Sequence, residues 1–149
     1  MTRFALVAII CALVAYSGTQ LGAHDAPHRV SLFNGKDLDN WTYAKTNRVG
    51  KWKVEDGQMT QEQKVDYCTI GEFEDFYLEV EFRSKPDGHG NRGVYLRGVY
   101  EVQIYNSTDK VKNVKDLKAH HGGGIYGKAP PSANPHKKQG EWNKYAILM

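Results

Sequence analysis

The residues with the clearest chemical potential lie in two consecutive stretches, 93–97 and 100–105, which are joined at Gly98. Both stretches alternate apolar and polar side chains, and this pattern predicts two β-strands that pair antiparallel across a short turn. We therefore expect Arg97, Glu101 and Gln103 to lie on one sheet face, within cross-strand reach of one another.

This set of side chains suits a polyhydroxylated ligand. Arg97 and Gln103 can donate hydrogen bonds to hydroxyl groups, and Glu101 can accept hydrogen bonds from them. The ring of Tyr95, at an alternate position of the first strand, can stack on the apolar face of a sugar. The alternative interpretation is a solvated outer face with a surface ion pair of small energetic value.

Paired carboxylates occur at Glu79 and Glu81, two residues apart on one predicted strand and therefore on the same face. Such pairs can perform the acid/base chemistry of glycosidic bond cleavage. Arg83 lies on the same face and can neutralise them, which favours a solvated strand face over a catalytic pair.

Adjacent histidines, His120 and His121, lie in a long segment with few apolar residues and are candidates for a general base or a metal ligand. Because neighbouring side chains point apart in extended backbone, we expect at most one of them to enter a site. No metal is predicted, because the sequence lacks HExxH, CxxC and comparable ligand spacings. No cofactor is predicted either, since phosphate-loop and dinucleotide fingerprints are absent.

Short β-strands position these side chains. The strongest covers 76–83, where Phe76, Leu78, Val80 and Phe82 alternate with polar residues. Residues 52–61 predict a hairpin, because Asp56-Gly57 is typical of a type I′ turn.

The C-terminal part of the chain contains a long loop and one further strand. Residues 106–140 contain three consecutive glycines and several prolines, which predicts a loop that is either functional or disordered, with a short strand or anchoring point at 125–127. Residues 142–149 predict a final strand whose apolar run ends without a turn or polar tail, so we expect the domain to be incomplete at this end. Residues 111–119 are the only weak helix candidate.

Composition supports one globular all-β domain. The chain has 149 residues, of which 40% are hydrophobic and 25% charged, in the ordinary globular range. The formal net charge is +3 and the basic residues form no stripe, which argues against nucleic acid as a partner.

The N-terminus resembles a secretory signal peptide over residues 1–23. Arg3 precedes an apolar run at 4–15, and small residues allow cleavage after Ser17 or after Ala23. A retained N-terminal anchor is the alternative. We expect no stable membrane insertion after removal of the signal, and a periplasmic or secreted protein.

Under this division, residues 24–29 form a polar leader and residues 30–149 the domain. Cys68 is then the single cysteine, so no intramolecular disulfide is available. Its apolar neighbours predict a buried, inert thiol.

Seven segments together resemble the 3-keto-disaccharide hydrolase domain family. In order along the chain they are 31–41, 52–57, 76–83, 91–98, 100–104, 123–127 and 140–143. The resemblance implies a concanavalin-like β-sandwich (jelly roll) of two antiparallel sheets, export, and cleavage of glycosides whose glucose ring is oxidised at C3. Family domains continue beyond the end of this chain, which agrees with an incomplete C-terminus.

Two segments depart from the family pattern. They are Asn91-Arg92-Gly93, where the family often has Asn-Ser-Gly, and Asn106-Ser107, where it often has Asp-Ser. These departures leave the substrate range open.

The expected function is therefore an exported hydrolase that acts on an oxidised (3-keto) saccharide by elimination followed by hydration. Arg97 would stabilise the enolate, and Glu101, His120 or His121 would act as the base. The residues expected to bind the sugar are Tyr95, Gln103, Tyr126, Trp142 and Asn143. The alternatives are a carbohydrate-binding β-sandwich module without catalysis and an inactive fragment.

Overall fold

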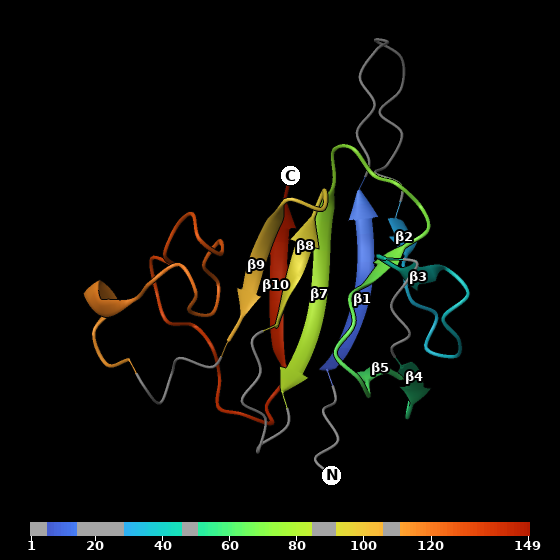
Figure 1. The fold of residues 1–149 in the computed structure, drawn as a ribbon, viewed down its shortest axis with the longest axis horizontal. Coiled ribbons are helices and arrows are strands. Elements are labelled where there is room, and N and C mark those ends of the chain that lie inside the picture. Colours follow the sequence, from blue (N-terminus) through green and yellow to red (C-terminus); the bar gives the residue numbers. More distant parts are fainter. Residues whose placement is uncertain (1–5, 15–28, 46–50, 85–91, 106–110) are drawn as a thin grey trace. The chain divides into compact units, whose positions relative to one another are not determined.

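The computed structural model describes residues 6–14, 29–45, 51–84, 92–105 and 111–149 (Figure 1). It divides into two compact units, one formed by residues 1–83 with 144–149 and the other by residues 84–143. Within the described ranges, the regular structure is β-strand apart from one 3₁₀ turn, η1 (Val114–Asp116). The all-β prediction is therefore confirmed, and the weak helix candidate at 111–119 is reduced to this single turn.

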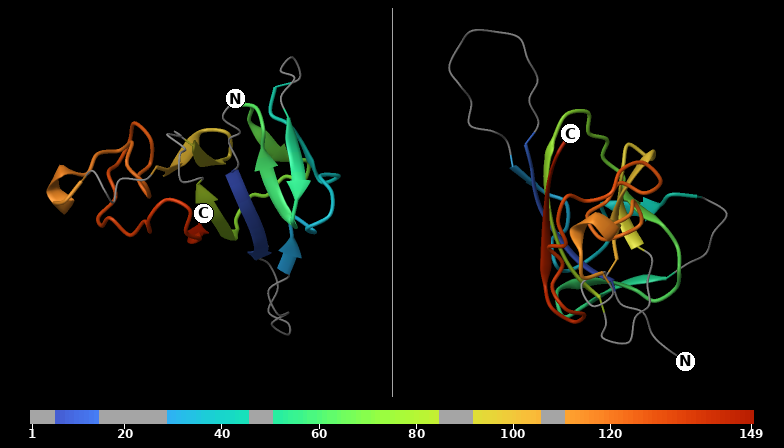
Figure 2. Two further views of the ribbon diagram at one scale, coloured as in Figure 1. Left: turned by 90° about the horizontal axis from the view of Figure 1, so that it is seen from below. Right: turned by 90° about the vertical axis from the view of Figure 1, so that its left-hand side faces the viewer.

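The first unit contains a six-stranded sheet. Its strands follow the order β10-β7-β1-β5-β4, with β2 paired to β1 (Figures 1 and 2). Their bounds are β1 (Leu6–Val14), β2 (Arg29–Ser31), β4 (Trp52–Glu55), β5 (Gln58–Gln61), β7 (Tyr77–Ser84) and β10 (Asn143–Leu148). A separate two-stranded sheet pairs β3 (Trp41–Tyr43) with β6 (Tyr67–Thr69), and β8 pairs with β9 in the second unit. The described residues thus form three sheets rather than a complete two-sheet sandwich, which stays a prediction.

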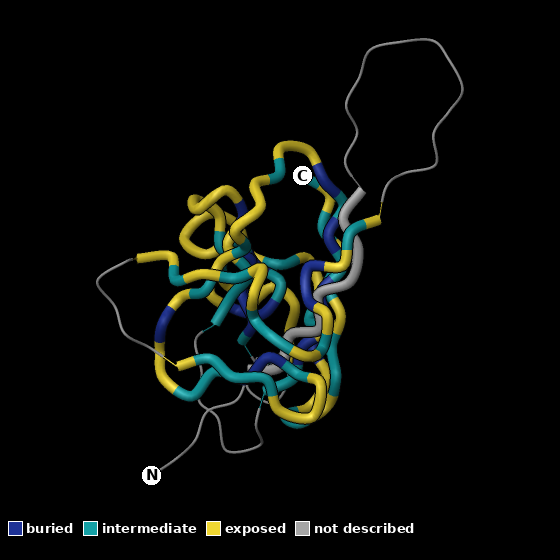
Figure 3. The backbone as a smooth tube through the Cα atoms, turned by 90° about the vertical axis from the view of Figure 1, so that its right-hand side faces the viewer, coloured by how far each residue is buried: buried dark blue, intermediate teal, exposed yellow. Residues whose placement is uncertain are grey.

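Strand β7 has the alternation that the sequence predicts. Leu78, Val80 and Phe82 are buried, whereas Glu81 is exposed and Glu79 is half-buried. Figure 3 shows buried positions interspersed with exposed ones along the backbone. Burial of one apolar face is what holds an antiparallel strand in a single register.

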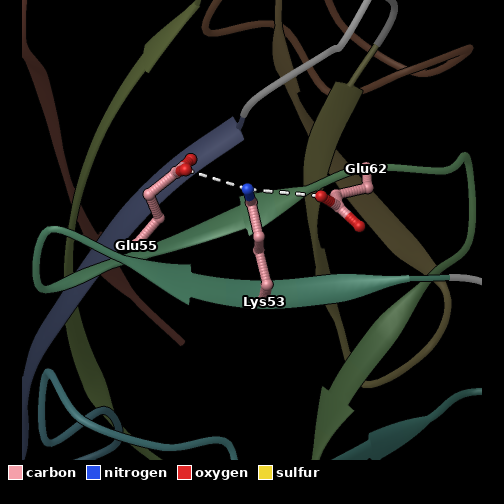
Figure 4. A network of polar contacts seen from close by, with 3 residues as sticks. All are labelled: Lys53, Glu55 and Glu62. Carbon is pink, nitrogen blue, oxygen red and sulfur yellow. Dashed lines mark hydrogen bonds and ion pairs between the residues drawn. The ribbon is translucent and has the colours of Figure 1, made fainter.

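The hairpin of β4 and β5 is also confirmed. Asp56 and Gly57 have φ angles of 52° and 70°, and both positive values are those of a type I′ turn. On the hairpin, Lys53 Nζ lies 2.9 Å from Glu55 Oε1 and 3.3 Å from Glu62 Oε1 (Figure 4). These carboxylates raise the pKa of Lys53, but ion pairs so accessible to water add little to stability.

Three aromatic rings form a cluster in this unit. The rings of Trp41 and Trp52 stack on Tyr67 at centroid distances of 6.1 and 5.9 Å. The indole N–H of Trp41 donates to the Leu32 carbonyl, and that of Trp52 to the Val65 carbonyl. Both indoles are therefore anchored to the backbone, and the cluster is structural.

The prediction of a buried thiol at Cys68 is wrong, because this residue is exposed. Cys68 pairs with Thr42 in the β3–β6 sheet, and its neighbours Tyr67 and Thr69 are the half-buried residues of β6. Alternation along the strand therefore turns the thiol outward.

Residues 6–14, part of the expected signal peptide, form strand β1 in the structure of the whole chain. Their removal on export stays a prediction, and residues 1–5 and 15–28 lie outside the described part of the chain. None of the helical structure in the described ranges is long and apolar enough to cross a membrane.

Candidate functional site

The predicted hairpin at the centre of the site is present in the second unit. Strand β8 (Arg92–Leu96) pairs antiparallel with β9 (Tyr100–Ile104), with Gly93 opposite Gln103 and Tyr95 opposite Glu101. Opposed residues of an antiparallel pair share a face, so these four residues lie on the same side of the hairpin. The predicted grouping of Tyr95, Glu101 and Gln103 is thus reproduced in the backbone register.

Arg97 does not join that face, and this part of the prediction is wrong. Arg97 has a φ of 51° and Gly98 a φ of 66°, while the Val99 N–H donates to the Leu96 carbonyl at 3.1 Å. These values describe a type I′ turn with Arg97 at its first central position. The turn begins one residue earlier than the alternation indicates, and Arg97 is exposed at the tip of the hairpin.

Gln103 is fully buried, so the open face expected for it is not observed. Its N–H donates to the Gly124 carbonyl and its carbonyl accepts from the Gly123 N–H, each at 2.9 Å. The Tyr126 N–H donates to the Glu101 carbonyl at 2.9 Å. The segment around 123–126 therefore lies along the second edge of β9, which confirms the predicted anchor at 125–127.

Accessibility rises from Gln103 towards the hairpin tip. Glu101 is half-buried, whereas Tyr95 and, on the neighbouring segment, Tyr126 are 54% and 51% exposed. A Cβ atom at Gly93 would stand 2.6 Å from Glu101 Oε1 and 2.8 Å from the Val102 carbonyl oxygen. The Glu101 side chain therefore lies across Gly93, where only glycine leaves room for it.

The two adjacent histidines lie together, contrary to the expectation that they point apart. The His121 N–H donates to the Lys118 carbonyl at 2.8 Å, so the backbone turns at 118–121 instead of extending. The rings of His120 and His121 have centroids 4.4 Å apart, and they lie 6.3 and 6.1 Å from the ring of Tyr105. The turn thus brings both imidazoles to the residue that follows β9.

The two imidazoles differ in environment. His120 is exposed, whereas His121 is only 9% exposed. A second hydrogen bond, from the Lys118 N–H to His121 Nδ1 at 2.8 Å, fixes the His121 ring. Burial lowers the pKa of His121, and the neighbouring His120 and Lys118 lower it further.

Sequence reasoning missed His136, which is buried beside this turn. A Cβ atom at Gly122 would collide with the His136 ring and with the Tyr105 carbonyl oxygen, so these groups close tightly around the glycine. Burial lowers the pKa of His136, and a hydrogen bond with the Tyr105 backbone partly offsets this effect. His136 lies in a segment without hydrophobic periodicity, so the sequence gives no direct sign of its burial. The one indirect signal is the glycine triplet at 122–124, because glycines often mark places where other groups pack closely against the backbone.

Trp142 directly precedes β10 and Asn143 is the first residue of that strand, and both are half-buried. Asn143 Oδ1 accepts from the Lys137 N–H at 2.9 Å, and its Nδ2 donates to the Glu141 carbonyl at 3.1 Å. The Asn143 amide therefore holds its own loop. Among the residues that the structure describes, no group of three or more His, Cys, Asp or Glu side chains is arranged to hold a metal ion.

The hairpin face of this β-rich chain carries a carboxylate, and exposed tyrosines and a histidine turn lie on the same unit. Residues 28–149 match the family model of the 3-keto-alpha-glucoside-1,2-lyase-like domain. The chain therefore belongs to this family, whose name implies cleavage of glycosidic bonds in oxidised glucosides, and the resemblance found in the sequence is confirmed. No curated protein and no solved structure matches the chain.

Proposed function

We propose that this protein cleaves the glycosidic bond of a 3-keto-glucoside by elimination across C1 and C2, followed by addition of water. The observation that carries the proposal is the family match over residues 28–149. The C3 ketone acidifies the C2 hydrogen, and a base removes it as a proton to leave an enolate. The enolate re-forms the ketone and expels the group at C1 with its bonding electrons. Water then adds across the resulting C1–C2 double bond and gives the free 3-keto sugar.

This chemistry needs a base near C2 and a donor near the enolate oxygen. The candidate bases are Glu101, which lies on the hairpin face, and His120, whose imidazole is exposed. Arg97 is exposed at the hairpin tip and is the proposed donor, because a guanidinium is permanently charged and carries several N–H groups.

The sugar contacts follow from accessibility. The exposed rings of Tyr95 and Tyr126 are suited to stacking, and Trp142 and Asn143 remain proposed contacts. Because Gln103 is fully buried, its proposed part is to hold the hairpin against the 121–124 turn.

The test is to incubate the purified full chain with a 3-keto-α-glucoside in D₂O and to follow the products by mass spectrometry and NMR. Elimination predicts an unsaturated keto sugar, or a hydrated product that carries deuterium at C2. The matched control is the same glucoside without the ketone, which should remain intact because its C2 hydrogen is not acidic. A cleaved product that retains its C2 hydrogen would contradict elimination, and saturable binding without any product would favour a binding module.

We also propose export, with residues 1–23 as the signal peptide and a periplasmic or secreted product. The apolar run at 4–15 behind Arg3 supports this proposal. The intact mass of the protein from a periplasmic fraction should correspond to cleavage after Ser17 or Ala23. Recovery of the uncleaved chain in the cytoplasm alone would contradict it.

A further inference from the structure

We propose that His121 is the neutral hydrogen-bond donor of the site and offers its Nε2–H to an oxygen of the substrate, rather than acting as the base. This inference rests on the proposed function for the identity of the substrate. The state of the imidazole, in contrast, follows from the geometry of the turn alone.

The hydrogen bond at Nδ1 determines the tautomer. The Lys118 N–H donates to His121 Nδ1 at 2.8 Å, and a nitrogen that accepts a hydrogen bond cannot itself carry a proton. A neutral imidazole has one N–H, which must therefore be at Nε2. The reciprocal bond from the His121 N–H to the Lys118 carbonyl, also 2.8 Å, holds the ring in this position.

The surroundings of His121 also favour the neutral form. Only 9% of the residue is exposed, and burial disfavours the charged imidazolium. The cationic Lys118 is on the same turn, the His120 ring lies 4.4 Å away, and the neutral Tyr105 ring faces it from the end of β9. His136, packed against the adjoining Gly122, is buried as well. None of these groups supplies the negative charge that would stabilise an imidazolium.

The remaining donor is open to an acceptor from outside the protein. Within the described ranges, no hydrogen bond from His121 Nε2 is present, and this nitrogen is not among the buried polar atoms that lack a partner, so it reaches the surface. A donor placed in this way is met by water or by a ligand. A ketone oxygen that becomes an enolate oxygen is a matching acceptor, and a neutral imidazole is able to polarise a carbonyl in this way.

This assignment changes the roles in the site. To act as a base, His121 would have to accept a proton at Nδ1 and break its bond with the Lys118 N–H. The base is therefore His120 or Glu101, and His121 is a donor that is set in place before the substrate binds.

The first test reads the tautomer by NMR in the full chain with ¹⁵N-labelled histidine. His121 should show an unprotonated Nδ1 and a protonated Nε2 in its neutral form. It should become protonated only at a lower pH than an unperturbed histidine, and its Nε2 signal should shift when a 3-keto-α-glucoside is added. A protonated Nδ1 in the neutral form, or an ordinary titration, would overturn the inference. If the chemical shift of His121 Nε2 does not change when the ligand is added, the donor role is wrong.

The second test uses two replacements that each keep one half of the imidazole. In His121→Gln the amide nitrogen reaches the place of Nε2, whereas in His121→Asn the amide can accept from the Lys118 N–H but cannot reach the substrate. We expect kcat to fall by about 10²–10³-fold in His121→Asn, the loss typical of one missing oxyanion donor, and clearly less in His121→Gln. The acidic limb of the pH–rate profile should survive in both variants, and its loss would identify His121 as the base.

The two proposals fail in different ways. If the wild-type chain cleaves no 3-keto-glucoside, the proposed function fails while the nitrogen spectrum still reports the tautomer of His121. If cleavage occurs and the tautomer is reversed, the proposed function stands and the donor assignment falls.

Discussion

Replacing Arg97 with Asn should separate the stability of the hairpin from the chemistry of the site. Arg97 has a φ of 51°, in the left-handed region, at the first central position of a type I′ turn. A side chain with a Cβ atom is disfavoured there by roughly 1–2 kcal/mol, and Asn is among the few residues that adopt this conformation readily. Asn-Gly is also the preferred pair for this turn, so Arg97→Asn relieves backbone strain without changing the register.

We expect the free energy of unfolding to rise by about 0.5–1 kcal/mol in Arg97→Asn, since Asn recovers part of the left-handed penalty. Arg97 is exposed, so loss of its surface contacts should subtract only a few tenths of a kcal/mol. The matched control is Asp56→Asn, because Asp56 has a φ of 52° in the type I′ turn of the other unit and is already a residue that tolerates this conformation. Urea denaturation of the three full-length proteins measures the difference.

Activity should move in the opposite direction. A hydrogen bond from a charged donor contributes about 1.5–3 kcal/mol, so loss of the guanidinium should lower kcat/KM for a 3-keto-α-glucoside by roughly 10–150-fold. Asp56→Asn should leave kcat/KM unchanged. A less stable Arg97→Asn protein would refute the turn argument, and a more stable protein with unchanged kinetics would remove Arg97 from the mechanism.

Three further predictions concern the packing, the carboxylates and the pH dependence of the protein. Gly122→Ala should lower the free energy of unfolding by about 1–3 kcal/mol in urea denaturation, because the new methyl group collides with the His136 ring and the Tyr105 carbonyl oxygen. The control is Gly71→Ala, which should change the free energy of unfolding little because its nearest contact would be at 3.4 Å. If Glu101 is the base, Glu101→Gln should abolish or strongly reduce cleavage in a product assay. The control Glu79→Gln should leave cleavage intact, because Glu79 is not on the β8–β9 hairpin and its carboxylate is paired with Lys144 Nζ at 2.7 Å. Burial lowers the pKa of His136, so below about pH 6.5 the unfolded chain binds more protons than the folded chain, and the free energy of unfolding should decrease as the pH is lowered. His136→Gln should reduce the difference between denaturation curves measured at about pH 7 and about pH 5.

The elements that depend on local patterns were predictable from the sequence. The alternation at 76–83 identifies β7 and its buried face, because a period of two is unambiguous over eight residues. Asp56-Gly57 identifies the β4–β5 hairpin, since few pairs adopt two positive φ angles. The pairing of β8 with β9 followed from the short connection between them.

The parts of the site that depend on a turn or on tertiary burial were not predictable. Arg-Gly carries no strong turn signal, so the alternation extended the strand through Arg97, although the backbone reverses there. His120 and His121 were expected to point apart, and a turn set by hydrogen bonds to Lys118 brings their rings together. Gln103 occupies a polar position in the alternation of β9, so the sequence places it on the outer face. It is buried because residues 123–126 lie along β9, a contact that the local pattern does not reveal.

The N-terminal segment links the fold to the proposed export. Strand β1 lies between β7 and β5, so each of these strands has β1 as one of its two neighbours. If export removes residues 1–23, β5 and β7 each lose that neighbour, and β2 loses its partner. Unpaired strand edges beside a buried apolar face readily accept another strand, because their N–H and C=O groups need partners. Processing would therefore change the sheet itself, and the folded state of the exported form depends on what pairs with β5 and β7 after β1 has gone.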